Sequence, residues 1–344
     1  MIKLGFKTIK KFNNDFFSIA EIGVNHNGLI SNAIQLIDQA NKAGFDAVKF
    51  QTFNSDIMLK KNTSLVKYQK NMNYKNMKNL LDDVSLSKEE FVKIKNYSDK
   101  KKIIFLSTPF DLESAEFLNK IGVPAFKIAS GDLDNFILLK KIKSFGKPII
   151  LSTGMAEKKE ISKTINFLKL KTKNLALLHC ISEYPTKTKD SQLSSLNELN
   201  RLKYVYGFSD HTIGMEASLA AVAMGSKIIE KHITLDKNMR GPDHKCSLEC
   251  KDLKIFIETL KDVIKSVNHH KRKITPNEKL TSRLVKKSIY YNENLEKNSL
   301  LKEKDLIAMR PRLNGISPSY FKKFIGKKLR KNVKKFEMLK IKHF

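Results

Sequence analysis

Eight short runs of apolar and β-branched residues recur along the first three quarters of the chain, and segments with helical periodicity separate them. The runs are FFSIAEI (16–22), FDAVKF (45–50), IIFLS (103–107), AFKIA (125–129), PIILS (148–152), LALLH (175–179), YVYGFS (204–209) and KIIEKH (227–232). Strands that alternate with helices pair in parallel through crossover connections. Eight such units in about 250 residues predict a (β/α)8 TIM barrel. A doubly wound open sheet is the alternative, but EIGVNHNG after the first run lacks the glycine spacing of a nucleotide-binding loop.

Polar side chains stand at the end of every predicted strand. In chain order they include Glu21, Asn25, His26 and Asn27; Lys49 and Gln51; Ser107 and Thr108; Lys127 and Ser130; Ser152 and Thr153; His179, Ser182 and Tyr184; Ser209, Asp210 and His211; and Glu230, Lys231 and His232. In a barrel the carboxyl ends of all strands meet at one face, where catalysis takes place. Hydroxyls, lysines, carboxylates and imidazoles on that face indicate a small, highly charged substrate.

The alternation of strand-like and helical segments ends near residue 268. We expect a barrel domain over residues 1–268, a linker over 269–284 around NHHKRKITPNEK, and a small β-rich domain over 285–344. The last segment holds three strand-like pieces, KKSIYY, LIAMRPRLNGISP and FEMLKI.

The net charge of +30 raises the alternative of a nucleic-acid-binding protein. Only 7 of the 65 basic residues are arginine, and the lysines are spread along the whole chain. Nucleic-acid readers usually rely on arginine forks in clustered basic patches, so we expect solvated lysine-rich surfaces and no nucleic-acid partner. The chain has no apolar run of membrane-spanning length, no convincing secretory signal and only three cysteines. These features favour a reduced, cytoplasmic protein without a membrane partner.

Several strand-end residues are candidates for chemistry. His211 and His232 close neighbouring strands and could share one divalent cation, although two hydrogen-bonded histidines would give the same pattern. Lys49 and Lys127 interrupt otherwise buried strands, and lysines with nearby hydroxyls suit phosphate and carboxylate groups. Glu21 lies between apolar neighbours, so it could be a general acid or base with a raised pKa, or half of a structural ion pair.

The cysteines offer weaker candidates. Cys246, Cys250 and His244 lack the second ligand pair that a structural zinc site needs. Cys180 follows His179 directly, and neighbouring residues of a strand point to opposite faces, so the two cannot form a nucleophile–base pair within a strand. We expect Cys180 to be a buried thiol.

The motifs AEIGVNHNG, AVKFQTF, STPFD, FKIASGD, LSTGM, HCISEYPT, GFSDHT and EKHITLDKNMRGPDHKCSLE occur in one order along the chain. Together they resemble the sialic acid synthase family, and RPRLNGISP resembles the small antifreeze-like (SAF, β-clip) domain that follows the barrel in that family. The resemblance covers nearly the whole chain.

The resemblance implies a transferase that condenses phosphoenolpyruvate with an N-acetylated hexosamine and water. The sugar would be N-acetylmannosamine or a 2,4-diacetamido-trideoxyhexose, and the products a nine-carbon sialic-acid-type (nonulosonic) acid and phosphate. A divalent metal ion is implied, Mn²⁺ first and Mg²⁺ or Co²⁺ as alternatives. A domain-swapped homodimer is implied as well.

The resemblance also implies residue roles. Glu21 matches the catalytic carboxylate, and His211 and His232 match the metal ligands. Residues that match phosphoenolpyruvate contacts are Lys49, Thr108, Lys127, Ser130, Ser152, Ser182 and Ser209. Residues that match sugar contacts are Gln51, Tyr184, Asp243 and Arg310. The chain departs from the family pattern in SEYP, where some relatives carry NIYP or TEYP, and in RPRLNGISP, which is one residue longer than the common RPGNGISP.

Three rival functions follow from the same residues. The first is another phosphoenolpyruvate-condensing aldol-type barrel synthase that uses a free phosphosugar, and the additional C-terminal domain argues against it. The second is the nucleic-acid-binding protein considered above. The third is an ice-interacting C-terminal module, for which the many lysines of residues 322–328 are poorly suited.

Overall fold

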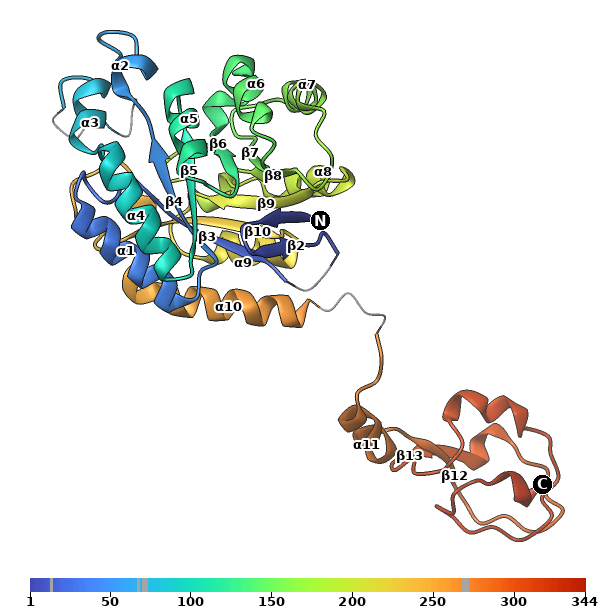
Figure 1. Cartoon of the computed structure of the whole chain (residues 1–344). Coiled ribbons are helices and arrows are strands. Elements are labelled where there is room, and N and C mark those ends of the chain that lie inside the picture. Colours follow the sequence, from blue (N-terminus) through green and yellow to red (C-terminus); the bar gives the residue numbers. More distant parts are fainter. Residues whose placement is uncertain (13–14, 67–68, 70–73, 268–271) are drawn as a thin grey trace. The chain divides into compact units, whose positions relative to one another are not determined.

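The computed structural model describes residues 1–12, 15–66, 69, 74–267 and 272–344. The chain forms two compact units, Met1–Asn268 and His269–Phe344, and each is described by itself (Figure 1). No helix within the described residues is long and apolar enough to cross a membrane.

The first unit is built on eight parallel strands, one at each predicted run. They are β3 (Phe17–Gly23), β4 (Ala47–Thr52), β5 (Ile104–Pro109), β6 (Phe126–Ile128), β7 (Ile149–Ser152), β8 (Leu175–His179), β9 (Val205–Asp210) and β10 (Ile228–Thr234). Their order is β5-β4-β3-β10-β9-β8-β7-β6, and the two ends of this order, β5 and β6, also contact each other. The predicted barrel is therefore confirmed as a nearly closed, eight-stranded parallel barrel.

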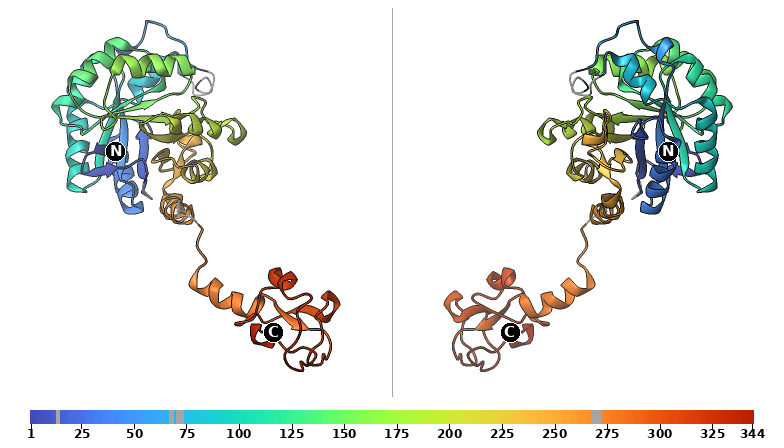
Figure 2. Two further views of the ribbon diagram at one scale, coloured as in Figure 1. Left: turned by 90° about the vertical axis from the view of Figure 1, so that its right-hand side faces the viewer. Right: turned by 90° about the vertical axis from the view of Figure 1, so that its left-hand side faces the viewer.

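Helices cover the outside of the strands (Figure 2). They are α1 (Ile30–Ala43), α4 (Lys88–Lys100), α5 (Leu112–Lys120), α6 (Phe136–Ser144), α7 (Lys158–Leu168), α8 (Leu196–Arg201), α9 (Glu216–Ala223) and α10 (Leu253–Ser266). Helix α1 turns an apolar stripe inward, formed by Ala33, Leu36, Ile37 and Ala40, and α10 does the same with Leu253, Phe256, Ile257 and Leu260. The stripes and the outward-facing strand residues form the largest core of the molecule. Two shorter helices, α2 (Ser55–Met58) and α3 (Met77–Asp83), lie in the long connection between β4 and α4.

The amino-terminal end of the barrel is closed by a hairpin that the sequence patterns did not predict. Its strands, β1 (Ile2–Leu4) and β2 (Lys7–Ile9), pair in antiparallel fashion. Ile2, Leu4 and Ile9 are buried among inward-facing residues of the barrel strands, such as Phe17 and Ile228. Because apolar side chains fill this end, the polar residues at the carboxyl ends line the open end.

The second unit contains α11 (Pro276–Val285), β12 (Ser288–Tyr291) and β13 (Leu306–Met309), and it has its own small core. Helix α11 occupies most of the segment predicted to be a linker. Thr275 and Glu278 cap each other's backbone amides and Pro276 starts the helix, an arrangement that favours helix over coil. FEMLKI does not form a regular strand: Met338 makes only an isolated bridge to Tyr290.

Candidate active site

A cavity of about 360 Å³ lies at the carboxyl ends of the barrel strands. Thirteen of the fourteen predicted site residues line it, and Arg310 belongs to the second unit. The thirteen are Glu21, Lys49, Gln51, Thr108, Lys127, Ser130, Ser152, Ser182, Tyr184, Ser209, His211, His232 and Asp243. They come from all eight strand ends, so the fold brings together side chains that span more than two hundred positions of the chain.

Glu21 and Lys49 form a buried ion pair across neighbouring strands β3 and β4. The Lys49 ammonium lies 2.6 Å from Glu21 Oε2 and donates to Thr108 Oγ1 at 3.1 Å. Both charged side chains are at most 4% exposed. Burial raises the pKa of Glu21 to about 7 even though Lys49 acts in the opposite direction. The geometry thus makes Glu21 half of a buried ion pair, and its role as a general acid or base stays a prediction.

Glu230 is a second buried carboxylate in the cavity, and it was absent from the predicted site. Its Oε1 lies 3.2 Å from the Lys127 ammonium and accepts a hydrogen bond from Ser209 at 2.8 Å. Its Oε2 lies 3.9 Å from Lys49. Burial alone would raise the pKa of Glu230, but the two lysines and Ser209 outweigh burial and lower it. Glu230 is consequently a fixed negative charge between two lysines.

The two predicted metal ligands are neighbours in the cavity, with ring centroids 5.6 Å apart. His211 Nδ1 contacts the carbonyl oxygen of Ile181 at 2.6 Å, and Nε2 makes only a long contact of 3.4 Å with the Ser209 hydroxyl. Metal-binding histidines commonly donate their second nitrogen to a carbonyl in this way. Burial lowers the pKa of His211 to about 4, and it lowers the pKa of His232 well below its usual value.

His232 Nδ1 is buried without a hydrogen-bond partner among the described residues, and it lies 3.7 Å from Asp243 Oδ2. Two neutral imidazoles, one with an unpartnered buried nitrogen, fit a divalent cation as donors. Within the described residues no group of three or more His, Cys, Asp or Glu side chains is arranged as a metal site. A cation held here would thus have two imidazole ligands and open positions for water and substrate.

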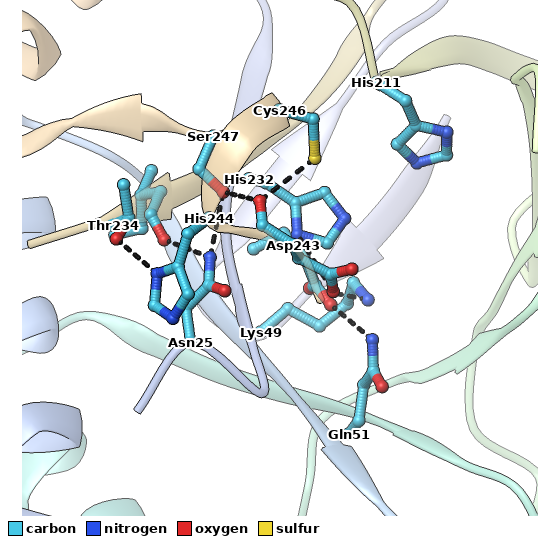
Figure 3. Close-up of polar contacts among 12 residues, drawn as sticks. Asn25, Lys49, Gln51, His211, His232, Thr234, Asp243, His244, Cys246 and Ser247 are labelled. Carbon is cyan, nitrogen blue, oxygen red and sulfur yellow. Dashed lines mark hydrogen bonds and ion pairs between the residues drawn. The ribbon is translucent and has the colours of Figure 1, made fainter. Parts of the chain in front are cut away.

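The loop after β10 is held by hydrogen bonds that fix Asp243 at the cavity (Figure 3). The Asp243 carbonyl oxygen accepts from Ser247 Oγ at 2.6 Å and from Cys246 Sγ at 3.1 Å. Asn25 Nδ2 in turn donates to Ser247 Oγ at 2.8 Å, which ties this loop to the end of β3. Burial raises the pKa of Asp243 to about 6.

The hydrogen bonds of this loop also hold His244, Cys246 and Cys250 apart, and these are the three residues of the zinc site that the sequence disfavours. His244 bonds Thr234 and Asn27 through its two ring nitrogens, and Cys250 donates to the Thr234 carbonyl oxygen. With Cys246 bonded to Asp243, the three side chains point to separate partners and do not converge. Cys180 is buried, as expected, but it also reaches the cavity, where its sulfur lies 3.1 Å from Ser130 Oγ.

A cluster of small polar groups forms another part of the cavity wall. The Gly154 amide donates to Ser130 Oγ at 3.0 Å. A side chain at position 154 would collide with Ser130, Cys180 and Ser182, so this close approach requires glycine. Ser152 is buried nearby at the end of β7. The result is a pocket of hydroxyl groups suited to a small oxyanion.

Part of the cavity lining is apolar, and the sequence patterns did not predict this. The apolar lining comes mostly from the β4–α4 connection with α2 and α3: Val24, Met58, Leu59, Val66, Met77, Leu80, Leu81 and Phe110. We call these residues the apolar wall. The length of the connection between the second strand and its helix was the only available indication of it.

Two arginines of RPRLNGISP differ in their surroundings in the second unit. Arg312 is tied down, since its guanidinium donates to the Lys287 carbonyl oxygen at 3.0 Å and to Ser317 Oγ at 3.1 Å. Arg310 is exposed, and it makes no hydrogen bond or ion pair with the residues that the structure describes. In the longer motif, Arg310 is therefore the arginine available for a ligand.

The barrel and its cavity define a (β/α)8 enzyme whose site is lined by buried lysines, carboxylates and imidazoles. A protein-family model described as the NeuB family matches residues 36–272. The chain belongs to this family, the sialic acid synthase family, as its motifs predict.

Named relatives agree with this assignment. The N,N'-diacetyllegionaminic acid synthase of Campylobacter jejuni is 39% identical over 328 residues, which are 94% of this chain and 98% of that protein. The N-acetylneuraminate-9-phosphate synthase of Drosophila melanogaster is 31% identical over 353 residues, covering 94% of each chain. Among solved structures, the N-acetylneuraminic acid (sialic acid) synthetase of Leptospira borgpetersenii in complex with citrate is 36% identical, with a TM-score of 0.72 over 81% of this chain and 94% of that one.

Proposed function

We propose that this enzyme condenses phosphoenolpyruvate with an open-chain N-acetylated hexosamine and water, giving a nine-carbon nonulosonic acid and inorganic phosphate. The observation that carries the proposal is the convergence of thirteen family-matched side chains on one cavity at the carboxyl ends of the strands. The family assignment and the names of the relatives support the same reaction class.

The anionic substrate would bind among the lysines and hydroxyls. Lys49 and Lys127 are already charge-balanced by Glu21 and Glu230, so an entering phosphate and carboxylate would compete for the same ammonium groups. Thr108, Ser130, Ser152, Ser182 and Ser209 would supply additional donors. Binding both reactants in one cavity makes the carbon–carbon bond formation effectively unimolecular.

Glu21 is proposed to act as the general base for the attacking water. The enol carbon of phosphoenolpyruvate attacks the aldehyde carbon, the aldehyde oxygen takes a proton from solvent, and the carbon that bears the phosphate ester becomes cationic. The Glu21 carboxylate would stabilise that cation and accept one proton from the attacking water, which it then returns to solvent. When the carbon–oxygen bond to phosphate breaks, the second proton of that water leaves with the phosphate, and a ketone remains.

His211 and His232 would hold the divalent cation as neutral donors, with Mn²⁺ as the first candidate and Mg²⁺ or Co²⁺ as alternatives. The cation would supply Lewis-acid polarisation of the sugar aldehyde. Asp243 lies 3.7 Å from His232 and has a raised pKa, so its protonated form could donate a hydrogen bond to a sugar hydroxyl. Gln51 and Tyr184 line the same region and would orient the sugar chain.

The apolar wall favours a 2,4-diacetamido-2,4,6-trideoxyhexose over N-acetylmannosamine. A second acetyl methyl group and a methyl group at carbon 6 can bury themselves against Met58, Met77 and Leu80, whereas hydroxyl groups there would lose their hydrogen bonds to water. The similarity to the diacetyllegionaminic acid synthase of Campylobacter jejuni agrees with this choice.

Arg310 is proposed to contact the N-acetyl group of the sugar from the partner subunit of a domain-swapped homodimer. Its free guanidinium offers several donors in a planar fork. A mixing experiment tests this assignment. Glu21→Gln and Arg310→Ala, each inactive alone, are combined after subunit exchange verified by mass. In a swapped heterodimer one of the two sites has both Glu21 and Arg310 intact, so activity partly returns; no recovery would show that Arg310 acts within its own chain or not at all.

The reaction itself is tested by incubating the protein with phosphoenolpyruvate, Mn²⁺ and a panel of hexosamines. We expect phosphate release coupled to a nine-carbon acid, largest with the diacetamido-trideoxy sugar. If free phosphosugars react and N-acetylated hexosamines do not, the rival barrel synthase is the better assignment.

A further inference from the structure

A fully buried ion pair lies directly behind the two predicted metal ligands. Asp210 ends β9, Lys231 lies in β10, and the two residues are partners in the parallel register of these strands. Lys231 Nζ lies 3.0 Å from Asp210 Oδ2, and both side chains are 0% exposed. Successive residues of a strand point to opposite faces. The pair therefore lies on the outer face of the barrel, while the next residues, His211 and His232, line the cavity.

The pair holds the backbone on which His211 sits. Asp210 Oδ1 accepts hydrogen bonds from the Thr212 amide and the Thr212 hydroxyl, both at 2.8 Å. Lys231 donates to the Thr212 carbonyl oxygen at 2.5 Å. The amide, hydroxyl and carbonyl groups of Thr212, the residue after His211, are thus all bonded to Asp210 or Lys231. In addition, Ser218 in α9 donates to Asp210 Oδ2 at 2.6 Å.

The pair is costly to bury, because an apolar residue at either position would avoid removing a charge from water. A buried ion pair is weak evidence for stability, and its best-attested role in proteins is to fix one specific geometry. Here that geometry fixes β9 to β10 at the point where each strand delivers an imidazole.

We infer that Asp210 and Lys231 are positioning residues that set the spacing of the His211 and His232 imidazoles for a divalent cation. The inference rests on the metal site proposed above. The pair lies outside the cavity lining and touches no substrate position. Outer-shell partners of metal ligands commonly change affinity by about 10- to 100-fold when removed.

The test uses the charge-neutral double variant Asp210→Asn/Lys231→Met. Asparagine keeps the size of the side chain but gives the Thr212 amide a weaker, neutral acceptor, and methionine keeps an unbranched side chain while losing the bond to the Thr212 carbonyl. Single variants would leave one buried charge unpaired and could fail to fold, so the double variant carries the test. The control is Thr164→Val, which removes a buried hydrogen bond of 2.9 Å to the Leu133 carbonyl in another part of the barrel.

Free Mn²⁺ is titrated against the full-length protein without substrates and followed by electron paramagnetic resonance. We expect the double variant to bind Mn²⁺ at least 10-fold more weakly than the wild type, with faster hydrogen exchange at the Thr212 amide, while Thr164→Val keeps the wild-type Kd. Equal Mn²⁺ affinity in wild type and a folded double variant would overturn the inference and leave the metal proposal intact. A wild type that binds no Mn²⁺ would refute the metal proposal and the inference with it. If the double variant does not fold, Lys231→Arg is measured instead: a wild-type Mn²⁺ Kd with normal exchange at Thr212 supports positioning, whereas a wild-type Kd with Thr212 exchange made at least 10-fold faster refutes it.

Discussion

Glu21→Gln is the sharpest single perturbation of the proposed chemistry, because it keeps the size of the side chain and removes its basicity. A positioned general base contributes about 10²- to 10⁴-fold, which corresponds to about 3–5 kcal/mol in the activation free energy. We therefore expect kcat to fall at least 10²-fold. The KM for phosphoenolpyruvate should not rise, since all lysine and hydroxyl donors remain and Lys49 is released from its ion pair with Glu21.

The same substitution should weaken the fold only modestly. Breaking a buried ion pair by removing one partner typically costs about 3–5 kcal/mol. Two features of the structure reduce that cost: burial raises the pKa of Glu21 to about 7, which disfavours its charged form in the fold, and Lys49 keeps Glu230 at 3.9 Å. We expect a loss of about 1–2 kcal/mol in the free energy of unfolding, so the drop in kcat is measured on folded protein.

Steady-state kinetics measure the loss of kcat in Glu21→Gln, and urea unfolding measures its loss of stability. Glu249→Gln is the matched control, since Glu249 and Lys251 are also 2.6 Å apart but Lys251 is 74% exposed; it should leave kcat unchanged. A divalent cation held by His211 and His232 would lower the pKa of Glu21, so the acid limb of kcat/KM in the wild type should lie at or below pH 7 and disappear in Glu21→Gln. A near-normal kcat in Glu21→Gln would reduce Glu21 to a structural partner of Lys49.

Three other outcomes are expected. His211→Ala and His232→Ala should each abolish turnover and Mn²⁺ binding without unfolding the barrel; activity of the wild type should be lost on chelation and restored by Mn²⁺, and full activity in metal-stripped protein would refute this. Burial lowers the pKa of His26 from 6.5 to about 4. Neutral His26 therefore contributes fully to the free energy of unfolding above pH 6.5, and this contribution is lost at up to about 1.4 kcal/mol per pH unit as the pH falls toward 4. In urea unfolding, the free energy of unfolding of His26→Asn should fall less steeply with pH over this range than that of the wild type. The wild type should prefer the diacetamido-trideoxy sugar over N-acetylmannosamine by about 10- to 100-fold in kcat/KM. Met77→Gln should lower this ratio, and an unchanged ratio would show that the apolar wall does not select the sugar.

Hydrophobic periodicity predicted the barrel well because each strand and helix has its own local sequence pattern. FFSIAEI or LALLH is apolar on both faces, as a strand must be when helices cover its outside and a packed core fills its inside. Polar residues at the strand ends then had to meet, since a closed parallel barrel leaves them only one common face. That topological constraint brought Glu21 and His232 into one cavity.

Other features depend on contacts that no local pattern encodes. The β1–β2 hairpin was missed because MIKLGFKTI is short, and Ile2 and Leu4 gain their burial only from the finished barrel. Glu230 was recognised at the end of its strand, but its part in the site depends on Lys127 and Ser209 from distant strands. Helix α11 lies in a segment whose polar composition predicts a linker, although Thr275, Pro276 and Glu278 form the pattern of a helix start.

The fate of the oxygen atoms in one turnover tests the proposed reaction most directly. Phosphoenolpyruvate, Mn²⁺ and the diacetamido-trideoxyhexose are incubated with the enzyme in water enriched in oxygen-18, and both products are analysed by mass. Cleavage of the carbon–oxygen bond predicts unlabelled inorganic phosphate and one oxygen-18 atom at carbon 2 of the nine-carbon acid. Oxygen-18 in the phosphate, or phosphate release without a nine-carbon acid, would contradict the proposed reaction.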